Sequence, residues 1–433
     1  MTNKIAITSG LFLLVLVCGC GDERADAPAP PPADTEMKKI EDAFEAVKGK
    51  YSRSILSLVR DAGEYGEKMK EAKKADNKEA LWEYRKALAG TMQEIAEQKR
   101  TMCVKMEDAL DGFEKMPEEK RRKYLPRHII MLGEVLTADS ITHPATGQTA
   151  YPNFSLRRTK KLCALLEQAV ETDAQIDLMK EMRGFVMFEC STENEKLLRT
   201  VMKHRPDMPE MKPALAGVLV LLGRFDEAID ILEKISPEND AEAKDIKEVI
   251  EKFEQYRRYW ESEKEYVKED EEKKAPRVRL KTTRGDIIVE LFQDDAPNTV
   301  DNFISLVEKG FYNETLFHRS EGWVVQGGDP LGCGIGGPGY CIKTETVGNR
   351  RRHFLGYMGM ARGEEKDTEG SQFYFVRCFR PRLDEGEYTV FGRIVEGMDV
   401  MLNLEQGDKI TEATFVNKHE HEGRNFTPET IPE

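Results

Sequence analysis

The chain lacks three features that would indicate nucleic-acid binding, a zinc site or a membrane span. Its 65 Lys and Arg residues are outnumbered by 79 Asp and Glu residues, and the net charge of −14 opposes binding to phosphate backbones. Its 8 cysteines include no Cys-x-x-Cys spacing, which disfavours zinc. The N-terminal apolar run, residues 11–17, is too short to span a bilayer comfortably. The 433 residues suffice for about two to four domains with a self-repelling, soluble surface.

The N-terminus has the layout of a secretory signal, in which Lys4 precedes the apolar run and small residues end it. The ending Val17-Cys18-Gly19-Cys20 resembles a bacterial lipobox, which implies a signal over residues 1–19 and acylation of Cys20. An ordinary cleaved signal with an incidental cysteine is the alternative. The Pro- and Ala-rich residues 20–36 then form an extended tether. We therefore expect an extracytoplasmic lipoprotein of a bacterium, on the periplasmic side, anchored in the membrane by its N-terminal lipid.

Export to that compartment permits disulfides. Cys333 and Cys341 lie eight residues apart in a glycine-rich segment, and whether they pair is left open. Cys103, Cys163 and Cys190 lie in helical patterns and are interpreted as small buried hydrophobic residues.

Residues 37–270 carry a helical pattern almost throughout. Apolar residues recur at three- and four-residue steps over residues 40–58 and again over residues 81–95, with charged residues between them. Breaks fall near residue 117, at residues 142–152 and at residues 206–213. The pattern predicts an all-α region of antiparallel helices with short connections.

One segment of this region, residues 213–239, resembles a tetratricopeptide helix pair. A first helix ends at Gly223-Arg224, and a second carries Ala228 and Leu232 on one face before a terminal Pro-Glu-Asn. A solenoid needs about three stacked units. Two interpretations therefore stay open: a solenoid whose concave face binds a protein partner, and a generic bundle with one repeat-like hairpin.

Two kinds of charged segment are expected to face solvent. Residues 261–274 form a charge run that is expected to continue the last helix and then fray into a linker, which puts a domain boundary between residues 270 and 275. The short basic clusters at residues 121–123 and 350–352 are interpreted as solvated faces rather than anion sites.

Beyond the linker the periodicity changes from helix to strand. Residues 278–282 and 287–291 alternate around a turn, which predicts a hairpin. Asp295 is expected to cap a helix that has Pro297 in its first turn and stops at Gly310. Short strands follow, and the whole predicts an antiparallel sheet or barrel with at least one flanking helix.

The last strand is expected at residues 410–416, and the tail, residues 419–433, is expected to be disordered. His419 and His421 lie in this tail and are therefore not expected to bind a metal.

An ordered set of short motifs runs through residues 275–418. In chain order they are Gly310-Phe311-Tyr312, Leu316-Phe317-His318-Arg319, Val325-Gln326-Gly327-Gly328-Asp329, Gly336-Gly337-Pro338-Gly339-Tyr340, Met360-Ala361-Arg362, Gly370-Ser371-Gln372-Phe373-Tyr374 and Val390-Phe391-Gly392-Arg393-Ile394. Together they resemble the core of the cyclophilin-type peptidyl-prolyl cis–trans isomerases. The resemblance implies a closed eight-stranded antiparallel β-barrel with flanking helices and a substrate groove on its outer face.

The resemblance also implies the chemistry and its residues. The family needs no cofactor, and its substrates are proline-containing polypeptides. Arg319 matches the catalytic arginine, and Gln326 matches the residue that orients it. The residues that match the substrate groove are Phe317, His318, Trp323, Val324, Ala361, Arg362, Gln372, Tyr374, Leu383 and Tyr388.

The chain departs from the family pattern at the turn after Arg319. The spacing to Gln326 is one residue shorter than usual, and Glu321-Gly322 replaces a proline-glycine. Arg382 also stands where many eukaryotic members carry a tryptophan tied to cyclosporin binding. Two hypotheses follow: an isomerase acting on folding exported proteins, and a proline-peptide binding module with little turnover. The pair Arg319 and Gln326 favours the first, whereas the shortened turn favours the second.

Overall fold

The computed structural model describes residues 33–137, 155–172, 192–206, 208, 210–417 and 426–432. The signal, most of the tether, Cys20, Cys190, His419 and His421 lie outside these residues. In the described part, no helix combines the length and apolar character that a bilayer crossing requires.

The N-terminal half is helical, as the periodicity predicts. Its helices are α1 (Thr35–Lys74), α2 (Lys78–Glu114), α3 (Glu118–Thr137), α4 (Leu156–Glu171), α6 (Thr192–His204), α7 (Met211–Leu221), α8 (Phe225–Glu233) and α9 (Asp240–Lys273). Helices α1 and α2 form a long antiparallel hairpin, and Ile40 packs against Gly112 where the two come close. Cys103 and Cys163 are buried, which confirms their interpretation as core residues.

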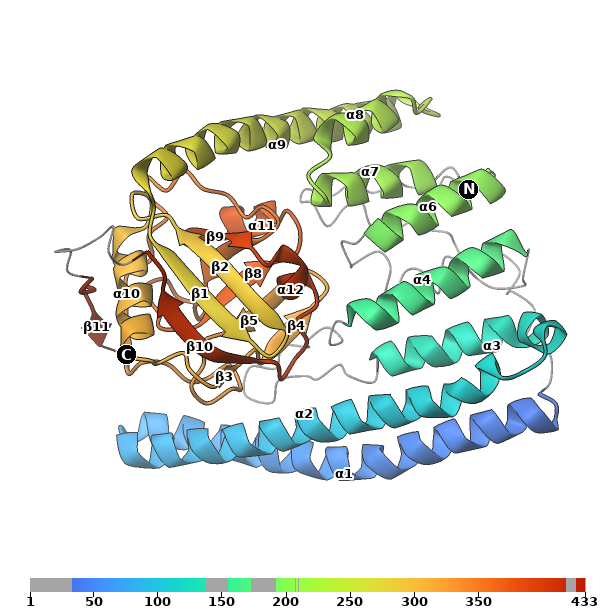
Figure 1. Cartoon of the computed structure of the whole chain (residues 1–433), viewed down its shortest axis with the longest axis horizontal. Coiled ribbons are helices and arrows are strands. Elements are labelled where there is room, and N and C mark those ends of the chain that lie inside the picture. The colour runs from blue at the N-terminus through green and yellow to red at the C-terminus, as the bar shows by residue number, and fades with distance from the viewer. Residues whose placement is uncertain are drawn as a thin grey trace.

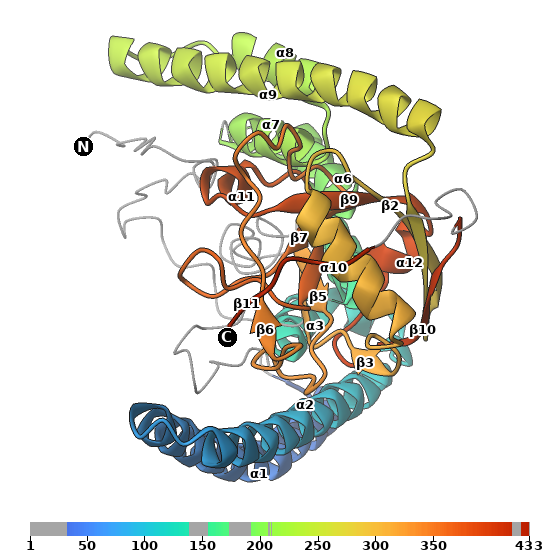
Figure 2. The ribbon, with the colours of Figure 1, turned by 90° about the vertical axis from the view of Figure 1, so that its left-hand side faces the viewer.

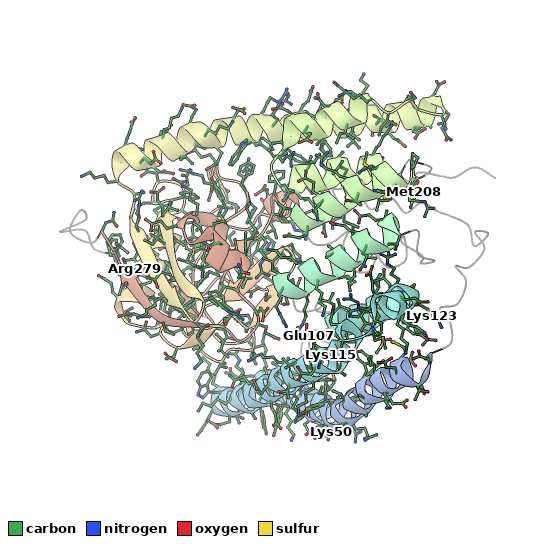
Figure 3. All side chains as sticks on the ribbon, turned by 45° about the vertical axis from the view of Figure 1, so that its right-hand side comes forward. Lys50, Glu107, Lys115, Lys123, Met208 and Arg279 are labelled. Atoms are coloured by element: carbon green, nitrogen blue, oxygen red, sulfur yellow. The ribbon has the colours of Figure 1, made fainter. Side chains whose placement is uncertain are left out.

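Successive helices of this half pack side by side (Figure 1). Glu107 of α2 joins the hairpin to the helices that follow, because its carboxylate lies 2.8 Å from Nη2 of Arg157 and 3.2 Å from Nε of Arg158, both on α4 (Figure 3). Helices α7 and α8 meet at Gly223, whose positive φ of 78° makes the tight turn that the sequence indicates.

The C-terminal domain is built on a curled antiparallel sheet. Its strands are β1 (Arg277–Thr282), β2 (Gly285–Leu291), β3 (Thr315–Leu316), β4 (Arg319–Glu321), β5 (Val324–Gly327), β7 (Tyr357–Met360), β8 (Phe373–Val376), β9 (Val390–Glu396) and β10 (Lys409–Phe415). Three helices accompany it, α10 (Pro297–Glu308), α11 (Pro381–Glu385) and α12 (Met398–Leu402). The hairpin β1–β2 pairs from Thr282 opposite Gly285, as predicted.

The expected closed eight-stranded barrel is not confirmed. The nine strands follow the order β3-β10-β1-β2-β9-β7-β8-β5-β4, and the edge strands β3 and β4 are not paired with each other. The concave side nevertheless encloses a core of Phe303, Phe373, Phe391 and their neighbours.

Two expectations about chain segments need correction. Asp295 does not cap α10: the helix begins after Ala296, and the Asp295 carboxylate binds Arg350 and Arg351. The end of the tail is not disordered, because β11 (Ile431–Pro432) pairs with β6 (Tyr340–Cys341).

The helical half flanks the C-terminal domain on opposite sides. Figures 1 and 2 show α9 along one side of the sheet and the α1–α2 hairpin along the opposite side. Gln93 of α2 donates to the Leu331 carbonyl at 3.0 Å, and the Phe379 N–H donates to the Leu221 carbonyl of α7 at 2.9 Å. Phe379 also contacts Tyr256 edge-on, with ring centroids 5.0 Å apart. The two halves therefore share one packed interface.

A buried ionic cluster anchors α9 to the sheet. Arg351, only 1% exposed, binds Glu263 at 2.9 Å, Asp270 at 2.7 Å and Asp295 at 2.8 Å. Burial raises the pKa values of Glu263 and Asp270, and Arg351 opposes this effect. The interpretation of residues 350–352 as a solvated face was therefore wrong for Arg351. The charge run also does not fray, because α9 stays helical to Lys273 and buries two of its carboxylates against this arginine.

Candidate active site

One row of side chains crosses the open end of the sheet. Antiparallel pairing puts Arg319 of β4 opposite Gln326 of β5, Gln326 opposite Tyr374 of β8, and Tyr374 opposite Gly359 of β7. Residues directly opposite one another point to the same face. The alternate residues, such as Val325, point into the core, so this row lies on the outer face of the sheet. Gly359 makes room for the Tyr374 ring, because a Cβ there would lie 2.5 Å from its Cζ atom.

Arg319 is held by two side chains. Its Nε donates to Glu321 Oε1 at 2.6 Å, and its Nη1 donates to Gln326 Oε1 at 3.3 Å. Gln326 is oriented in turn, because its Nε2 donates to Gln372 Oε1 at 3.0 Å, and Gln372 Nε2 donates to the Gly336 carbonyl at 2.8 Å. The Arg319 side chain is 39% exposed. The arrangement presents a fixed cation to a ligand on the outer face.

Glu321 is a site residue that sequence reasoning noted only as a departure from the family turn. Its side chain is 2% exposed, and its second oxygen, Oε2, accepts the indole N–H of Trp323 at 2.8 Å. The same carboxylate therefore fixes Arg319 and Trp323. The Arg319 guanidinium centre lies 5.1 Å from the centroid of the Trp323 ring. The only sequence signal for this role was an acidic residue in a turn two residues from the arginine.

The residues predicted to hold the proline ring gather beside Arg319. Trp323, Leu383 and Tyr388 are half-buried, while Val324 and Tyr374 are almost fully buried. The Tyr374 and Tyr388 rings meet edge-on with centroids 6.4 Å apart. These side chains form an apolar and aromatic surface whose chemical character suits a pyrrolidine ring.

Tyr374 is held from behind by a residue that sequence reasoning missed. The buried His353 contacts the Tyr374 hydroxyl through Nε2 at 2.9 Å and Asp384 Oδ1 through Nδ1 at 2.6 Å. Burial raises the pKa of Tyr374 well above its ordinary value, so its hydroxyl stays protonated. No motif pointed to His353, because it lies outside the ordered set.

The remaining predicted groove residues divide into two groups. Ala361 and Gln372 are half-buried at the site, and Arg362 lies 4.4 Å from the Tyr388 ring centroid while donating to the carbonyls of Gly363, Glu364 and Gly386.

Phe317, by contrast, is completely buried in the core on the concave side, which argues against direct contact with a substrate. His318 is half-buried, with its ring against Gly334 and its carbonyl accepting from Gln406.

Two family models match parts of this chain. The family model described as "Cyclophilin type peptidyl-prolyl cis-trans isomerase/CLD" matches residues 277–420, and a tetratricopeptide repeat model matches residues 195–250. A peptidyl-prolyl cis–trans isomerase of Helicobacter pylori is 45% identical over 152 residues, which are 34% of this chain and 92% of that protein. The chain belongs to the cyclophilin-type peptidyl-prolyl cis–trans isomerases.

Two further comparisons concern the same domain. Peptidyl-prolyl cis–trans isomerase B of Bacillus subtilis is 47% identical over 124 residues, which are 28% of this chain and 85% of that protein. The crystal structure of a Cryptosporidium parvum cyclophilin, determined in the presence of the dipeptide Ala-Pro, covers 33% of this chain and 99% of its own, with 29% identity and a TM-score of 0.30.

The enzyme class predicted from the sequence is thereby confirmed: the protein is a peptidyl-prolyl cis–trans isomerase. The match also confirms the tetratricopeptide character of the segment around α7 and α8.

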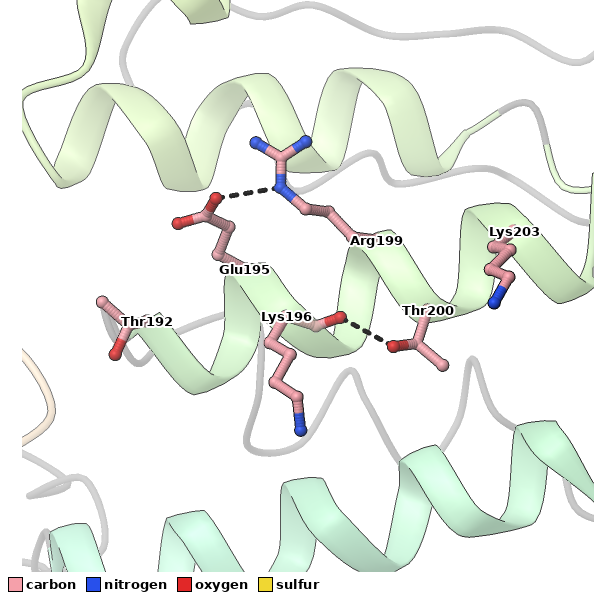
Figure 4. A pocket seen from close by; sticks show the side chains of 6 residues that line it. All are labelled: Thr192, Glu195, Lys196, Arg199, Thr200 and Lys203. Carbon is pink, nitrogen blue, oxygen red and sulfur yellow. Dashed lines mark hydrogen bonds and ion pairs between the residues drawn. The ribbon is translucent and has the colours of Figure 1, made fainter.

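A hollow on the helical half lies apart from this site. It opens along α6 and is lined by Thr192, Glu195, Lys196, Arg199, Thr200 and Lys203 (Figure 4). Three of its charged residues are engaged with one another or with a neighbouring helix: Arg199 donates to Glu195 at 2.9 Å, and Lys196 donates to Glu167 at 2.6 Å. Nothing in this lining resembles a proline pocket.

Proposed function

We propose that the cyclophilin-type domain accelerates rotation about X-Pro bonds by using Arg319 to stabilise the twisted amide. Resonance holds the planar amide with a rotation barrier of about 18–20 kcal/mol. Twisting the bond localises a lone pair on the prolyl nitrogen. A fixed cation aimed at that nitrogen stabilises the twisted state more than the planar state, and this difference lowers the barrier. Arginine suits this task because it stays protonated and can also donate to a nearby carbonyl.

The observation that carries this proposal is the way Arg319 is held. Glu321 engages Nε and Gln326 engages Nη1, so the guanidinium is oriented before a substrate arrives. Within the described part of the chain, Nη2 has no hydrogen-bond partner and is available to the substrate. A substrate proline bound against Trp323 would be close to Arg319, because the guanidinium centre lies 5.1 Å from the centroid of the Trp323 ring. Gln372 and Ala361 then line the path of the substrate backbone.

The location and the clients are part of the same proposal. The signal layout and Cys20 support a lipid-anchored protein that acts outside the cytoplasm on exported polypeptides. The helical half supports recruitment, because α2 and α7 contact the isomerase domain at Leu331 and Phe379, in the segments that flank the pocket. A client or partner held by these helices would be close to Arg319.

Two experiments test the proposal. For the anchor, cells of a bacterial host expressing the full chain are fed labelled palmitate. Label in the membrane fraction that disappears in Cys20→Ser supports it, whereas label that persists in Cys20→Ser contradicts it. For the mechanism, cis–trans exchange of an Ala-Pro tetrapeptide is measured with the full chain. Arg319→Lys keeps the charge but loses the planar fork, so we expect kcat/KM between those of the parent and Arg319→Ala.

A further inference from the structure

A second arginine lies at the proposed proline pocket. It belongs to the segment before α11, whereas Arg319 belongs to β4. Arg380 precedes the first turn of α11, and its backbone is fixed at both ends. Its N–H donates to the His353 carbonyl at 2.8 Å, and its carbonyl accepts from the N–H of Leu383 at 3.0 Å. The side chain turns toward the site, where its guanidinium centre lies 4.7 Å from the centroid of the Trp323 ring. Trp323 therefore has two cations against it, Arg319 and Arg380.

The two arginines differ in how their charges are balanced. Arg319 is paired with the buried carboxylate of Glu321 at 2.6 Å. Arg380 has no carboxylate within ion-pair distance among the residues that the structure describes, and it is half-buried rather than dispersed in solvent. Arg362, on the far side of the pocket, donates to backbone carbonyls of Gly363, Glu364 and Gly386. Arg362 also lies near the carboxylates of Glu369 and Glu387, so Arg380 is the arginine of this rim for which the described residues supply no carboxylate partner.

A guanidinium that stacks on an aromatic ring still presents its N–H groups at the edge. Those donors match a carboxylate in geometry and charge. A proline bound against Trp323 brings its chain neighbours close to Arg380, since consecutive residues of an extended peptide advance by about 3.3–3.6 Å. The contact with Trp323 covers the face of the Arg380 guanidinium but gives its N–H groups no hydrogen-bond acceptor.

We infer that Arg380 makes this isomerase prefer substrates with an Asp or Glu residue next to the proline. The inference rests on the proposed function, because it takes the surface of Trp323, Tyr374 and Leu383 as the proline pocket. Arg380 acts here as a specificity-determining residue and takes no part in the rotation step itself.

The test uses four peptides that differ only in carrying Glu or Lys directly before or directly after the proline, plus an Ala peptide as reference. Exchange between the isomers is measured by NMR with the full chain at low salt, without a coupling protease whose own specificity would interfere. For at least one of the two positions, the wild type is expected to turn over the Glu peptide about three- to fivefold faster in kcat/KM than the Lys peptide, the range of a partly exposed ion pair. The ratio should fall toward one at about 0.5 M salt.

Three variants isolate the charge from the ring contact. Arg380→Gln should lose the Glu preference, Arg380→Lys should retain it, and Arg380→Glu should invert it. Arg279→Glu makes the same charge change on β1, where Arg279 faces Asp286 away from the pocket (Figure 3), and should leave the ratio unchanged.

The outcomes separate this inference from the proposed function. Equal rates for Glu and Lys peptides at both positions, or a Glu preference that survives Arg380→Glu, would overturn the inference while leaving the isomerase mechanism intact. Failure of the wild type to accelerate exchange in any of the five peptides would instead count against the proposed function itself.

Discussion

Replacement of Arg351 by alanine should destabilise the interface between the helical half and the C-terminal domain. The substitution removes the cation that contacts Glu263, Asp270 and Asp295, at 2.9, 2.7 and 2.8 Å. Asp295 keeps its contact with Arg350, whereas Glu263 and Asp270 are left buried without this cation. Breaking a buried pair in this way costs about 3–5 kcal/mol, because the remaining charges are unpaired in a poorly solvated site. Since two of the carboxylates belong to α9 and one to the loop before α10, the loss falls on the interface between the halves.

The loss should also depend on pH. Burial already raises the pKa values of Glu263 and Asp270, and removal of Arg351 should raise them further. The folded state then binds more protons than the unfolded state, so stability falls as pH rises above the ordinary carboxyl pKa of about 4. The deficit of Arg351→Ala relative to wild type is therefore expected to be larger at pH 8 than at pH 5.

Urea unfolding followed by circular dichroism measures the free energy of unfolding at both pH values, and limited proteolysis reports release of α9. Arg279→Ala is the matched control: its contact with Asp286 is 3.7 Å long and exposed, so its removal should change the free energy by less than about 0.5 kcal/mol. A loss below about 1 kcal/mol in Arg351→Ala at both pH values would refute the argument.

Three further predictions concern single residues. Glu321→Gln removes the charge that holds Arg319 and Trp323, so we expect kcat/KM to fall about tenfold in the peptide-exchange assay. An unchanged or higher kcat/KM would contradict this role of Glu321. Phe317→Leu should cost about 1 kcal/mol of stability with kcat/KM unchanged, because Phe317 lies in the core; a selective loss of activity would show that it belongs to the groove. His128 is buried, and burial lowers its pKa from 6.5 to about 3. As the pH falls, His128 is therefore protonated in the unfolded state before the folded state, and the free energy of unfolding should fall by up to about 1.4 kcal/mol per pH unit below pH 6.5. His128→Phe should flatten that decline relative to wild type in denaturant titrations at pH 5 to 7, and parallel curves for the two proteins would contradict the assignment.

The sequence predicted the parts of the fold that local patterning controls. The helical stripes over residues 40–58 and 81–95 lie in α1 and α2, and the alternation at residues 278–291 lies in the hairpin β1–β2. The pairing of Arg319 with Gln326 was implied by the resemblance to the cyclophilin family, which the contiguous motifs carry. These features depend on neighbours in sequence or on a contiguous pattern, which one sequence is enough to reveal.

Long-range electrostatic contacts were beyond prediction for a physical reason. Arg351 and Glu263 look like ordinary members of charged segments, and only the packing of α9 on the sheet buries them together. Charged residues are rarely buried without partners, so a charged segment is expected to face solvent. That expectation failed for Arg351 because its partner Glu263 lies 88 residues away in the sequence. The roles of Glu321 and His353 were missed for the same reason, since they depend on atoms that only the fold brings together.

The proposed isomerisation mechanism depends most directly on Arg319. Cis–trans exchange of an Ala-Pro tetrapeptide, measured by NMR with the full chain and with Arg319→Ala, compares the rotation rate with and without the cation. The proposed mechanism makes Arg319 the electrostatic stabiliser of the twisted amide, so it predicts that kcat/KM falls about 10²- to 10³-fold in the variant, while the unfolding curve stays close to that of the wild type. A folded Arg319→Ala protein with an unchanged kcat/KM would contradict the mechanism.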